Sequence, residues 1–269
     1  MSFEKVLEEL PSVVEQFREE NEIKLYTIIK DDIFRLLNKY CIIIYYPLED
    51  ESNWGFRTKR FVNGKLEDFV FINTARTLAE QVFIAAHELG HVWDVNSKLA
   101  EIAPESKNLT AKEEEDIIDR FAAELLMPPQ RFKGSFMENT MLLGLNTKVI
   151  RIEDLIRVMV LLMRDYMVPY ESVRRRLLET KLLSESAGKT LEENEERVST
   201  IVKAVSNDLN IFIDRPTKKK AIPGLRALMK KIEKDKLLDA YTISKIKTDF
   251  DLSSINEFKD TVNISDGDM

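Results

Sequence analysis

Apolar residues recur at steps of three and four positions over residues 3–38 and again over residues 152–184. This spacing places them on one face of a helix, so it predicts amphipathic helices in both segments. Proline cannot donate a hydrogen bond within a helix, so Pro11 and the Val168-Pro169 pair are expected to interrupt them. Weaker patterns of the same period predict a helical C-terminal region, over residues 197–212, 224–238 and 242–250.

Two parts of the chain are expected to be extended. Residues 41–48, CIIIYYPL, are β-branched and aromatic and end beside a proline, which is typical of a buried strand. Residues 56–73 hold Asn63-Gly64 between two extended runs, the strongest short-range signal for a hairpin. The sequence therefore predicts a mostly helical α+β fold with a small antiparallel or mixed sheet.

Two helices with capping signals are predicted in the middle of the chain. Thr77 can cap a helix that runs from Leu78 to about Val95. Thr110 and Glu113 have the spacing of a capping box, and the helix that they begin should end at Pro128-Pro129. The neighbouring segments lack a helical period and are expected to be loop, irregular chain and linker, over residues 96–109, 131–148 and 184–196.

Composition narrows the class of protein. Apolar residues make up 44% of the 269 residues and charged residues 32%, which suits a chain that buries a core. The net charge of −7 argues against direct binding to nucleic acid. The single cysteine, Cys41, cannot form a disulfide within the chain and is expected to be a buried small hydrophobe. Without a signal-type core or about 18 uninterrupted apolar residues, the chain is expected to be cytoplasmic, with no membrane segment.

Both histidines of the chain, His87 and His91, lie in the stretch FIAAHELGHVWDV at residues 83–95. On a helix, residues four apart lie one turn apart on the same face, so both imidazoles can point at one metal ion. Glu88 is rotated by about 100° from His87, so it can reach a water on the metal without becoming a ligand. Zinc lowers the pKa of such a water to about 7, and Glu88 would accept its proton and pass it to the leaving amine.

The simpler interpretation is that these are two core histidines on one helix. A buried histidine is more often a hydrogen-bonded core residue than a metal ligand, and short motifs match by chance. Here, however, the only two histidines of the chain fall at this spacing, and they do so on a predicted amphipathic helix. The metal site is therefore the favoured interpretation.

A catalytic zinc site needs a third protein ligand, and the chain has no third histidine. The next predicted helix offers five carboxylates: Glu113, Glu114, Glu115, Asp116 and Asp119. Glu115 and Asp119 are four apart and share the face that the apolar residues of this helix continue. We expect Glu115 to be the third ligand and Asp119 to accept the free ring N–H of a ligating histidine. The alternative is that Glu115 is a solvated charge in an acidic run.

Hydrolysis also needs a group that stabilises the oxyanion of the transition state beside the metal. No histidine is left for this role, so the side-chain candidates are Tyr166, Tyr170 and Arg120. Tyrosines at such positions more often pack in the core with a hydrogen-bonded hydroxyl, and this alternative stays open for both.

The stretch HELGH (87–91), followed by EDIIDRFAAELLMP (115–128), resembles the ImmA/IrrE-type metallopeptidases. Their pattern is HExxH, then a helix with Glu-x-x-x-Asn/Asp that runs into FAAxLLMP. Glu115 and Asp119 match the Glu and the Asn/Asp, whereas Ile117 stands where the family often has a second Glu. The resemblance covers about residues 40–184 and is specific only in the two motif helices.

The resemblance implies a zinc-dependent endopeptidase, holding one Zn²⁺, that inactivates a helix-turn-helix transcriptional repressor in bacteria and so derepresses mobile-element or stress genes. We expect a peptidase domain over residues 1–184, with the small sheet packed on the HExxH helix, followed by a helical region, 185–269, without an assigned role. The residues alone support only metal-dependent hydrolysis. A peptide substrate is favoured because an extended chain could add to the sheet edge formed by residues 66–72.

Other functions remain open at this point. The chain could be a non-proteolytic regulator that binds its partner through the same fold, or a metal hydrolase with a non-peptide substrate. The run Arg174-Arg175-Arg176 lies in a pattern like a helix-turn-helix, for which DNA binding is one interpretation. A helical hairpin that closes the catalytic core is favoured instead, because the chain is acidic overall and Val173 and Leu177 supply an apolar face.

Overall fold

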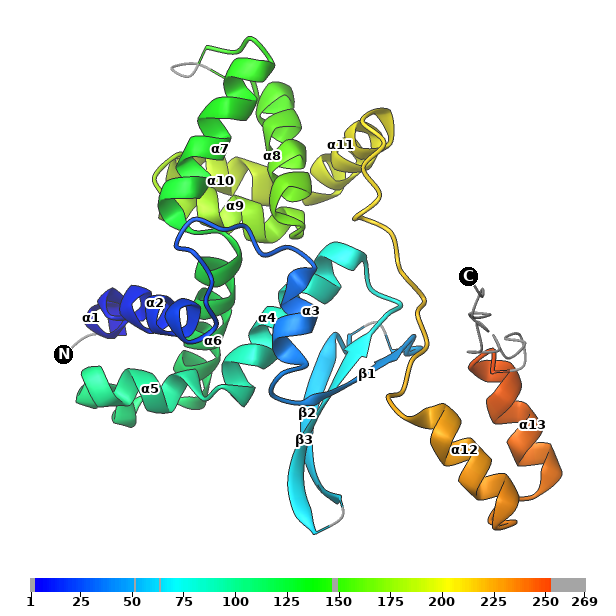
Figure 1. The fold of residues 1–269 in the computed structure, drawn as a ribbon. Helices are drawn as coiled ribbons and strands as arrows, with labels where there is room; N and C mark the ends of the chain where they lie inside the picture. The colour runs from blue at the N-terminus through cyan, green and yellow to red at the C-terminus, as the bar shows by residue number, and fades with distance from the viewer. Residues whose placement is uncertain (1–2, 51, 63, 147–149, 253–269) are drawn as a thin grey trace, which may run out of the picture. The chain divides into compact units, whose positions relative to one another are not determined.

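The computed structural model describes residues 3–50, 52–62, 64–146 and 150–252. The chain forms two compact units, residues 1–219 and residues 220–269. The first unit is a mostly helical α+β structure around one small mixed sheet, as predicted (Figure 1). The predicted division into a peptidase domain, residues 1–184, and a helical C-terminal region, residues 185–269, stays a prediction.

The sheet has three strands in the order β1-β3-β2. β1 (Ile42–Tyr46) pairs with β3 (Lys65–Asn73) in parallel, and β2 (Gly55–Val62) pairs with β3 in antiparallel fashion. The predicted strand and hairpin are thus confirmed, although Asn63 itself lies outside the described residues. The expectation that residues 66–72 form an edge is wrong, because β1 joins the far side of β3. Among the described strands the edges are β1 and β2.

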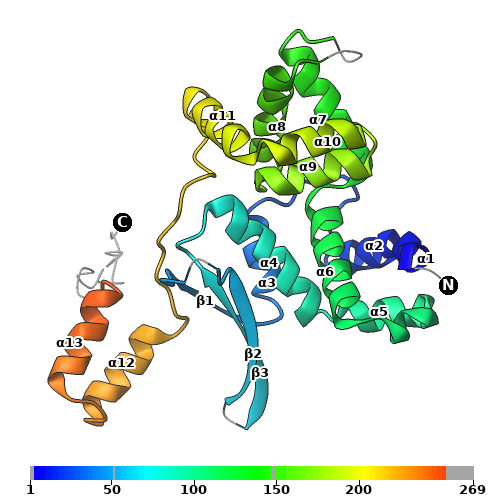
Figure 2. The same cartoon turned by 180° about the vertical axis from the view of Figure 1, so that it is seen from behind.

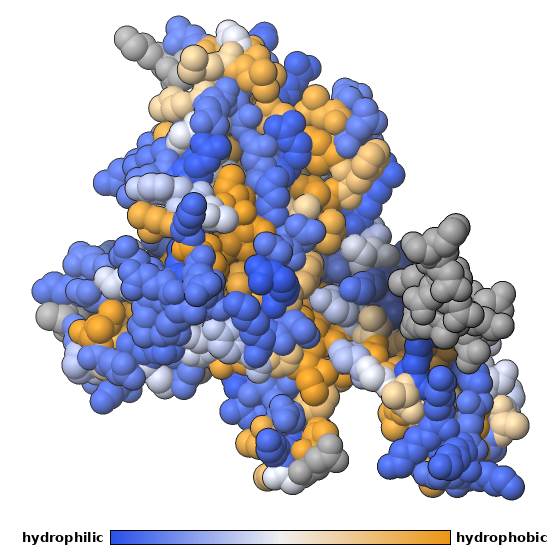
Figure 3. Space-filling model, viewed as in Figure 1, coloured by the Kyte–Doolittle hydropathy of each residue, from blue (hydrophilic) through white to orange (hydrophobic). Residues whose placement is uncertain are grey.

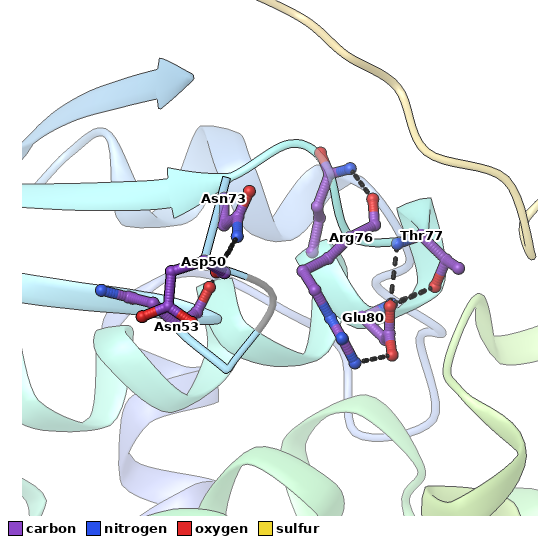
Figure 4. Close-up of polar contacts among 7 residues, drawn as sticks. Asp50, Asn53, Asn73, Arg76, Thr77 and Glu80 are labelled. Atoms are coloured by element: carbon purple, nitrogen blue, oxygen red, sulfur yellow. Dashed lines mark hydrogen bonds and ion pairs between the residues drawn. The ribbon is translucent and has the colours of Figure 1, made fainter. Parts of the chain in front are cut away.

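The central helix of the first unit is α4 (Leu78–Val92), which packs against β2, β3 and α6 (Ala111–Leu126). Both helices begin with a capping box: the one at Thr110 was predicted, and at Thr77 the predicted cap is part of a box with Glu80. In α4 the backbone N–H of Thr77 donates to Glu80 at 2.8 Å and the N–H of Glu80 donates to the Thr77 hydroxyl at 3.3 Å (Figure 4). Arg76 forms an ion pair with the same carboxylate. These contacts fix where the helix starts, and hence where its histidines lie.

The loop that precedes β2 is tied to the end of β3 by one buried amide. The Asn73 side chain donates to the carbonyl of Asn53 at 2.6 Å and to that of Asp50 at 3.3 Å. Figure 4 shows this contact beside the start of α4. The amide therefore holds the strand end and the helix start in one arrangement.

Of the N-terminal helices, α3 (Asp32–Leu37) packs on α4 and α2 (Leu10–Glu20) packs on α6, while α1 (Phe3–Glu8) packs on α2. Phe17 of α2 is fully buried, with its ring edge-on to Trp93 at 5.0 Å and to Phe121 at 5.8 Å. Cys41, just before β1, is buried as expected, and burial raises the pKa of its thiol to about 12. These contacts form a continuous core beneath the two central helices.

A second group of helices completes the first unit: α7 (Pro129–Leu142), α8 (Ile152–Tyr166), α9 (Tyr170–Glu179), α10 (Glu185–Glu193) and α11 (Glu195–Asp208). Figures 1 and 2 show them gathered at one end of the unit. The predicted turn at Val168-Pro169 does separate α8 from α9. The face seen in Figure 3 is mostly hydrophilic, with hydrophobic side chains over α7 and α8, where Met141 and Leu142 are exposed.

Three segments that were expected to be irregular are helical. Residues 95–108 form α5 (Val95–Ile102) and a short 3₁₀ helix, η1 (Pro104–Asn108), and residues 129–142 and 185–193 form α7 and α10. Local caps start two of them: the Asp94 side chain accepts from the N–H of Ser97, and that of Ser184 accepts from the N–H of Ala187. The helices α5 and α10 have 8 and 9 residues, too few to show an apolar period in the sequence. The 14 residues of α7 form a helix without a clear apolar period.

Residues 213–217 run across the first turn of α4. The carbonyls of Arg215 and Ile213 accept from the N–H groups of Leu78 and Ala79, at 3.0 and 2.9 Å. The first N–H groups of a helix have no partner within it, so this segment satisfies two of them. The chain that leaves α11 is therefore part of the support of α4.

The second unit contains the helices α12 (Leu225–Lys234) and α13 (Ala240–Asp249). An ion pair of 2.5 Å between Lys247 and Glu233 joins them. In the part of the chain that the structure describes, no helix combines the length and the apolar character needed to cross a membrane.

Candidate metal centre

Helix α4 brings both histidines to one point. The Nε2 atoms of His87 and His91 lie 3.1 Å apart, and each lies 3.4 Å from the Glu115 Oε2 atom, which comes from α6. Ligands held about 2.0–2.1 Å from a tetrahedral zinc are about 3.3–3.4 Å from one another. The three atoms therefore have the spacing of one face of a zinc tetrahedron.

A glycine allows α6 to approach this face. Gly90, between Glu88 and His91, packs on α6, and a Cβ atom at this position would lie 3.1 Å from Ile118 and 3.2 Å from Phe121. Those distances are tighter than most Cβ contacts, so a larger residue would require the Ile118 and Phe121 side chains to shift by a few tenths of an ångström. The close approach of α4 and α6 is what places Glu115 beside the imidazoles.

Asp119 sets the orientation of the first imidazole. Its carboxylate accepts from Nδ1 of His87 at 2.8 Å. With the ring proton held at Nδ1, the lone pair of neutral His87 is on Nε2 and faces His91 and Glu115. This arrangement of a carboxylate behind a ligating histidine is the usual support of a zinc site.

The pKa values of the two histidines differ because their surroundings differ. Burial opposes protonation of His87, but the hydrogen bond and charge of Asp119, with Glu88 and Glu115, raise its pKa. For His91, burial and the charge of His87 lower the pKa, and Glu115 only partly offsets them. The two neighbouring imidazoles and the Glu115 carboxylate can hold a divalent cation, which would replace the proton that the surrounding acids favour on His87.

Glu88 is buried beside this cluster, with 5% of its surface exposed. Burial and the charge of Glu115 raise the pKa of Glu88, while His87 and Arg57 lower it. Its Oε2 atom has no hydrogen-bond partner among the described residues. A buried carboxylate oxygen needs a partner, and a water at the metal face would supply one. The donor set and this oxygen together fit a catalytic zinc site.

The cluster lies between two depressions of the surface. An open groove of 540 Å³ follows β2 and is lined by Gly55 to Lys59 together with His87, Glu88, His91 and Glu115. On the other side, a cleft of 620 Å³ between α6 and α9 is lined by Phe83, Ile84, His87, Arg120, Ala123 and Leu178, among others. An extended ligand could pass from the groove across the cluster into the cleft.

The structure separates the three oxyanion candidates. Tyr166 is fully buried in the α7–α8 core, and its hydroxyl donates to Ser135 at 2.9 Å, so it is not available at the metal face. Tyr170 lines a different cavity and does not line the cleft or the groove. Arg120 lines the cleft beside His87 and lies 3.8 Å from Glu179. Of the three, only Arg120 is brought to the depressions around the cluster.

One supporting residue was missed from the sequence. Arg57 of β2 donates to the backbone carbonyl of His91 at 2.9 Å and to Asp68 of β3 at 2.6 Å. A cation at the end of a helix stabilises the last carbonyls. The hairpin pairs Arg57 with Val70 and Lys59 with Asp68, so Arg57 and Asp68 lie diagonally on one face. The predicted hairpin turn at Asn63-Gly64 implies this strand register. No signal in the sequence indicated that Arg57 would also contact the end of α4.

Replacing Asp119 by Ala is expected to weaken zinc binding by about 10–100-fold, because His87 would lose the partner that fixes its tautomer and direction. Competition titration with a chromogenic chelator measures the affinity. Glu114→Ala, an exposed acid of the same helix, is the matched control and should leave the affinity unchanged. Equal affinities for Asp119→Ala and wild type would refute the supporting role of Asp119.

Comparisons with known proteins complete the description of the site. Residues 41–178 match the Peptidase_M78 family, whose domain is described as IrrE N-terminal-like. No curated protein matches the chain. A solved structure of a Mycobacterium tuberculosis transcriptional regulator is similar at 16% identity and a TM-score of 0.41, over 66% of this chain and 52% of that one. The chain thus spans about half the length of that protein.

Proposed function

This chain belongs to the Peptidase_M78 family, and from that premise we propose that it is a zinc-dependent endopeptidase. The observation that carries the proposal is the face of three ligand atoms, His87 Nε2, His91 Nε2 and Glu115 Oε2, with spacings of 3.1–3.4 Å. The family match covers the strands and helices that build this face.

Each residue of the site has one task in the proposed reaction. Zinc, when bound, lowers the pKa of water to about 7 and polarises the carbonyl that is attacked. Glu88 accepts the proton of the attacking water and gives it to the leaving amine. Its burial raises its pKa, which favours the uptake of that proton. Asp119 keeps the His87 ring aimed at the face.

A peptide is the substrate that suits the surroundings of the site. Among the described strands, β2 pairs on one side only, and the groove along it contains His87, Glu88 and Glu115. An extended chain can add to such an edge through backbone hydrogen bonds, which gives affinity without a specific sequence. The role once expected for residues 66–72 is therefore assigned to β2.

We assign the substrate to the helix-turn-helix repressors, on the strength of the family resemblance and the charge of the chain. A DNA-binding protein carries a basic surface, and the net charge of −7 on this chain would speed their encounter. Cleavage of a repressor derepresses its target genes. Such a substrate places the enzyme in the cytoplasm.

Incubation of the purified, zinc-loaded protein with the repressor encoded beside its gene tests this proposal. We expect discrete fragments, identified by mass spectrometry, that disappear with a chelator and return with zinc. Fragments that persist in the chelator would contradict a metal-dependent reaction. An intact repressor that is nevertheless bound by the protein would identify a non-proteolytic regulator instead.

A further inference from the structure

A second cavity of 450 Å³ lies in the first unit, apart from the metal ligands. It is enclosed by the first turn of α4, by α8 to α11 and by the segment that crosses α4 at Asp214. Its apolar walls include Met163, Leu191 and Val202, all of them buried. Cavities of this size and composition typically bind small molecules or side chains of a partner.

Two buried polar atoms in this cavity have no hydrogen-bond partner among the described residues. They are the Tyr170 hydroxyl and the Oδ1 atom of Asp214. An unpartnered buried polar group destabilises the folded protein, and a charged one does so more strongly. Both residues also line the cavity, so a ligand that enters it lies beside the Asp214 side chain and can donate a hydrogen bond to its carboxylate.

The charged residues that line the cavity determine which sign of charge its ligand would carry. Two of its cations are paired within the wall, Arg76 with Glu80 and Arg174 with Glu192 (Figure 4 shows the first pair). The exposed rim carries Arg175 and Lys203, and equally Glu171 and Glu195. These charges cancel, so the half-buried Asp214 leaves the residues that line the cavity with one net negative charge.

We propose that this cavity binds an organic cation, an alkylammonium or guanidinium group on an apolar stem. The cationic head donates to Asp214, and the stem packs against Met163 and Val202. A lysine or arginine side chain has this form, since its methylene stem is apolar and only its end is charged.

The position of the cavity links it to the catalytic cleft. Trp54, Pro169, Glu171 and Arg175 line both. Asp214 also lies between Ile213 and Arg215, whose carbonyls hold the first turn of α4. A cation in the cavity therefore comes either from a protein chain that continues out of the cleft or from a free amine. The proposal does not depend on hydrolysis, since it concerns binding alone.

Isothermal titration calorimetry tests this site with N-acetyl-lysine methylamide, and with the norleucine derivative as its uncharged counterpart. We expect saturable binding of the lysine compound only, weakened at least about 10-fold by Asp214→Asn, which removes the charge and keeps the shape. Asp208→Asn, an exposed acid of α11 outside the cavity, should bind like wild type. Equal affinity for the two compounds, an unchanged affinity in Asp214→Asn, or no saturation would overturn the proposal.

A second variant and a second ligand complete the test. Should Asp214→Asn fail to fold, Tyr170→Phe removes only the buried oxygen, and a weaker affinity supports the site whereas an unchanged one refutes it. Titration with 1,5-diaminopentane then identifies the source of the cation. Tighter binding of the blocked lysine points to a protein side chain, and tighter binding of the diamine points to a free amine; both results support the cation site.

Discussion

Peptide hydrolysis should fall by about 10²–10⁴-fold when Glu88 is replaced by Gln, while zinc stays bound. The amide has the shape of the carboxylate but cannot accept the proton of the attacking water. Because Glu88 is 5% exposed and its burial raises the pKa of the carboxylate, the neutral side chain removes a desolvation cost. The variant is therefore expected to unfold at the same temperature as wild type or a higher one.

Single-turnover cleavage of a fluorogenic peptide, together with zinc content and thermal unfolding, measures these three properties on one preparation. The combination separates a catalytic role from a structural one, since loss of zinc or of stability would explain inactivity without any role in proton transfer. Full cleavage by a folded, zinc-loaded Glu88→Gln variant would exclude Glu88 as the general base.

Replacing Glu115 by Ala should weaken zinc binding at least about 100-fold, because the site loses one of its three ligands. At a free zinc concentration 1,000 times the wild-type Kd, zinc stabilises the wild-type protein by about 4.1 kcal/mol. A 100-fold weaker site would gain only about 1.4 kcal/mol at the same concentration. Chemical denaturation with and without zinc measures both values.

Glu114→Ala is the matched control for this result. Glu114 is the adjacent exposed acid of α6, and it does not belong to the three-residue cluster. We expect it to keep the full zinc-dependent stabilisation. A Glu115→Ala variant as strongly stabilised by zinc as this control would show that Glu115 is the solvated charge of an acidic run.

The parts of the site that lie within one turn of helix could be predicted from the sequence. His87 and His91 are fixed by helix geometry, and the capping boxes at Thr77 and Thr110 show where the two motif helices start. Helix periodicity also placed Glu115 and Asp119 on one face, and the structure brings both beside His87. Local rules suffice here because each relation spans only a few residues.

Relations between distant segments could not be predicted in the same way. Which side of β3 receives β1 depends on how the whole sheet packs, so the edge strand was misplaced. The contact of Arg57 with the His91 carbonyl joins a strand to a helix end 34 positions away. The short helices α5 and α10 start at single caps, whereas α7 has 14 residues but no side-chain cap, and the sequences of all three lack a clear apolar repeat.

The central claim is that His87, His91 and Glu115 hold one zinc ion beside Glu88. A crystal structure of the zinc-loaded protein, with anomalous diffraction collected at the zinc absorption edge, tests it most directly. We predict one peak about 2.0–2.2 Å from His87 Nε2, His91 Nε2 and the Glu115 carboxylate, with Glu88 outside bonding distance. A peak elsewhere, or one ligated by Glu88 in place of Glu115, would contradict the account.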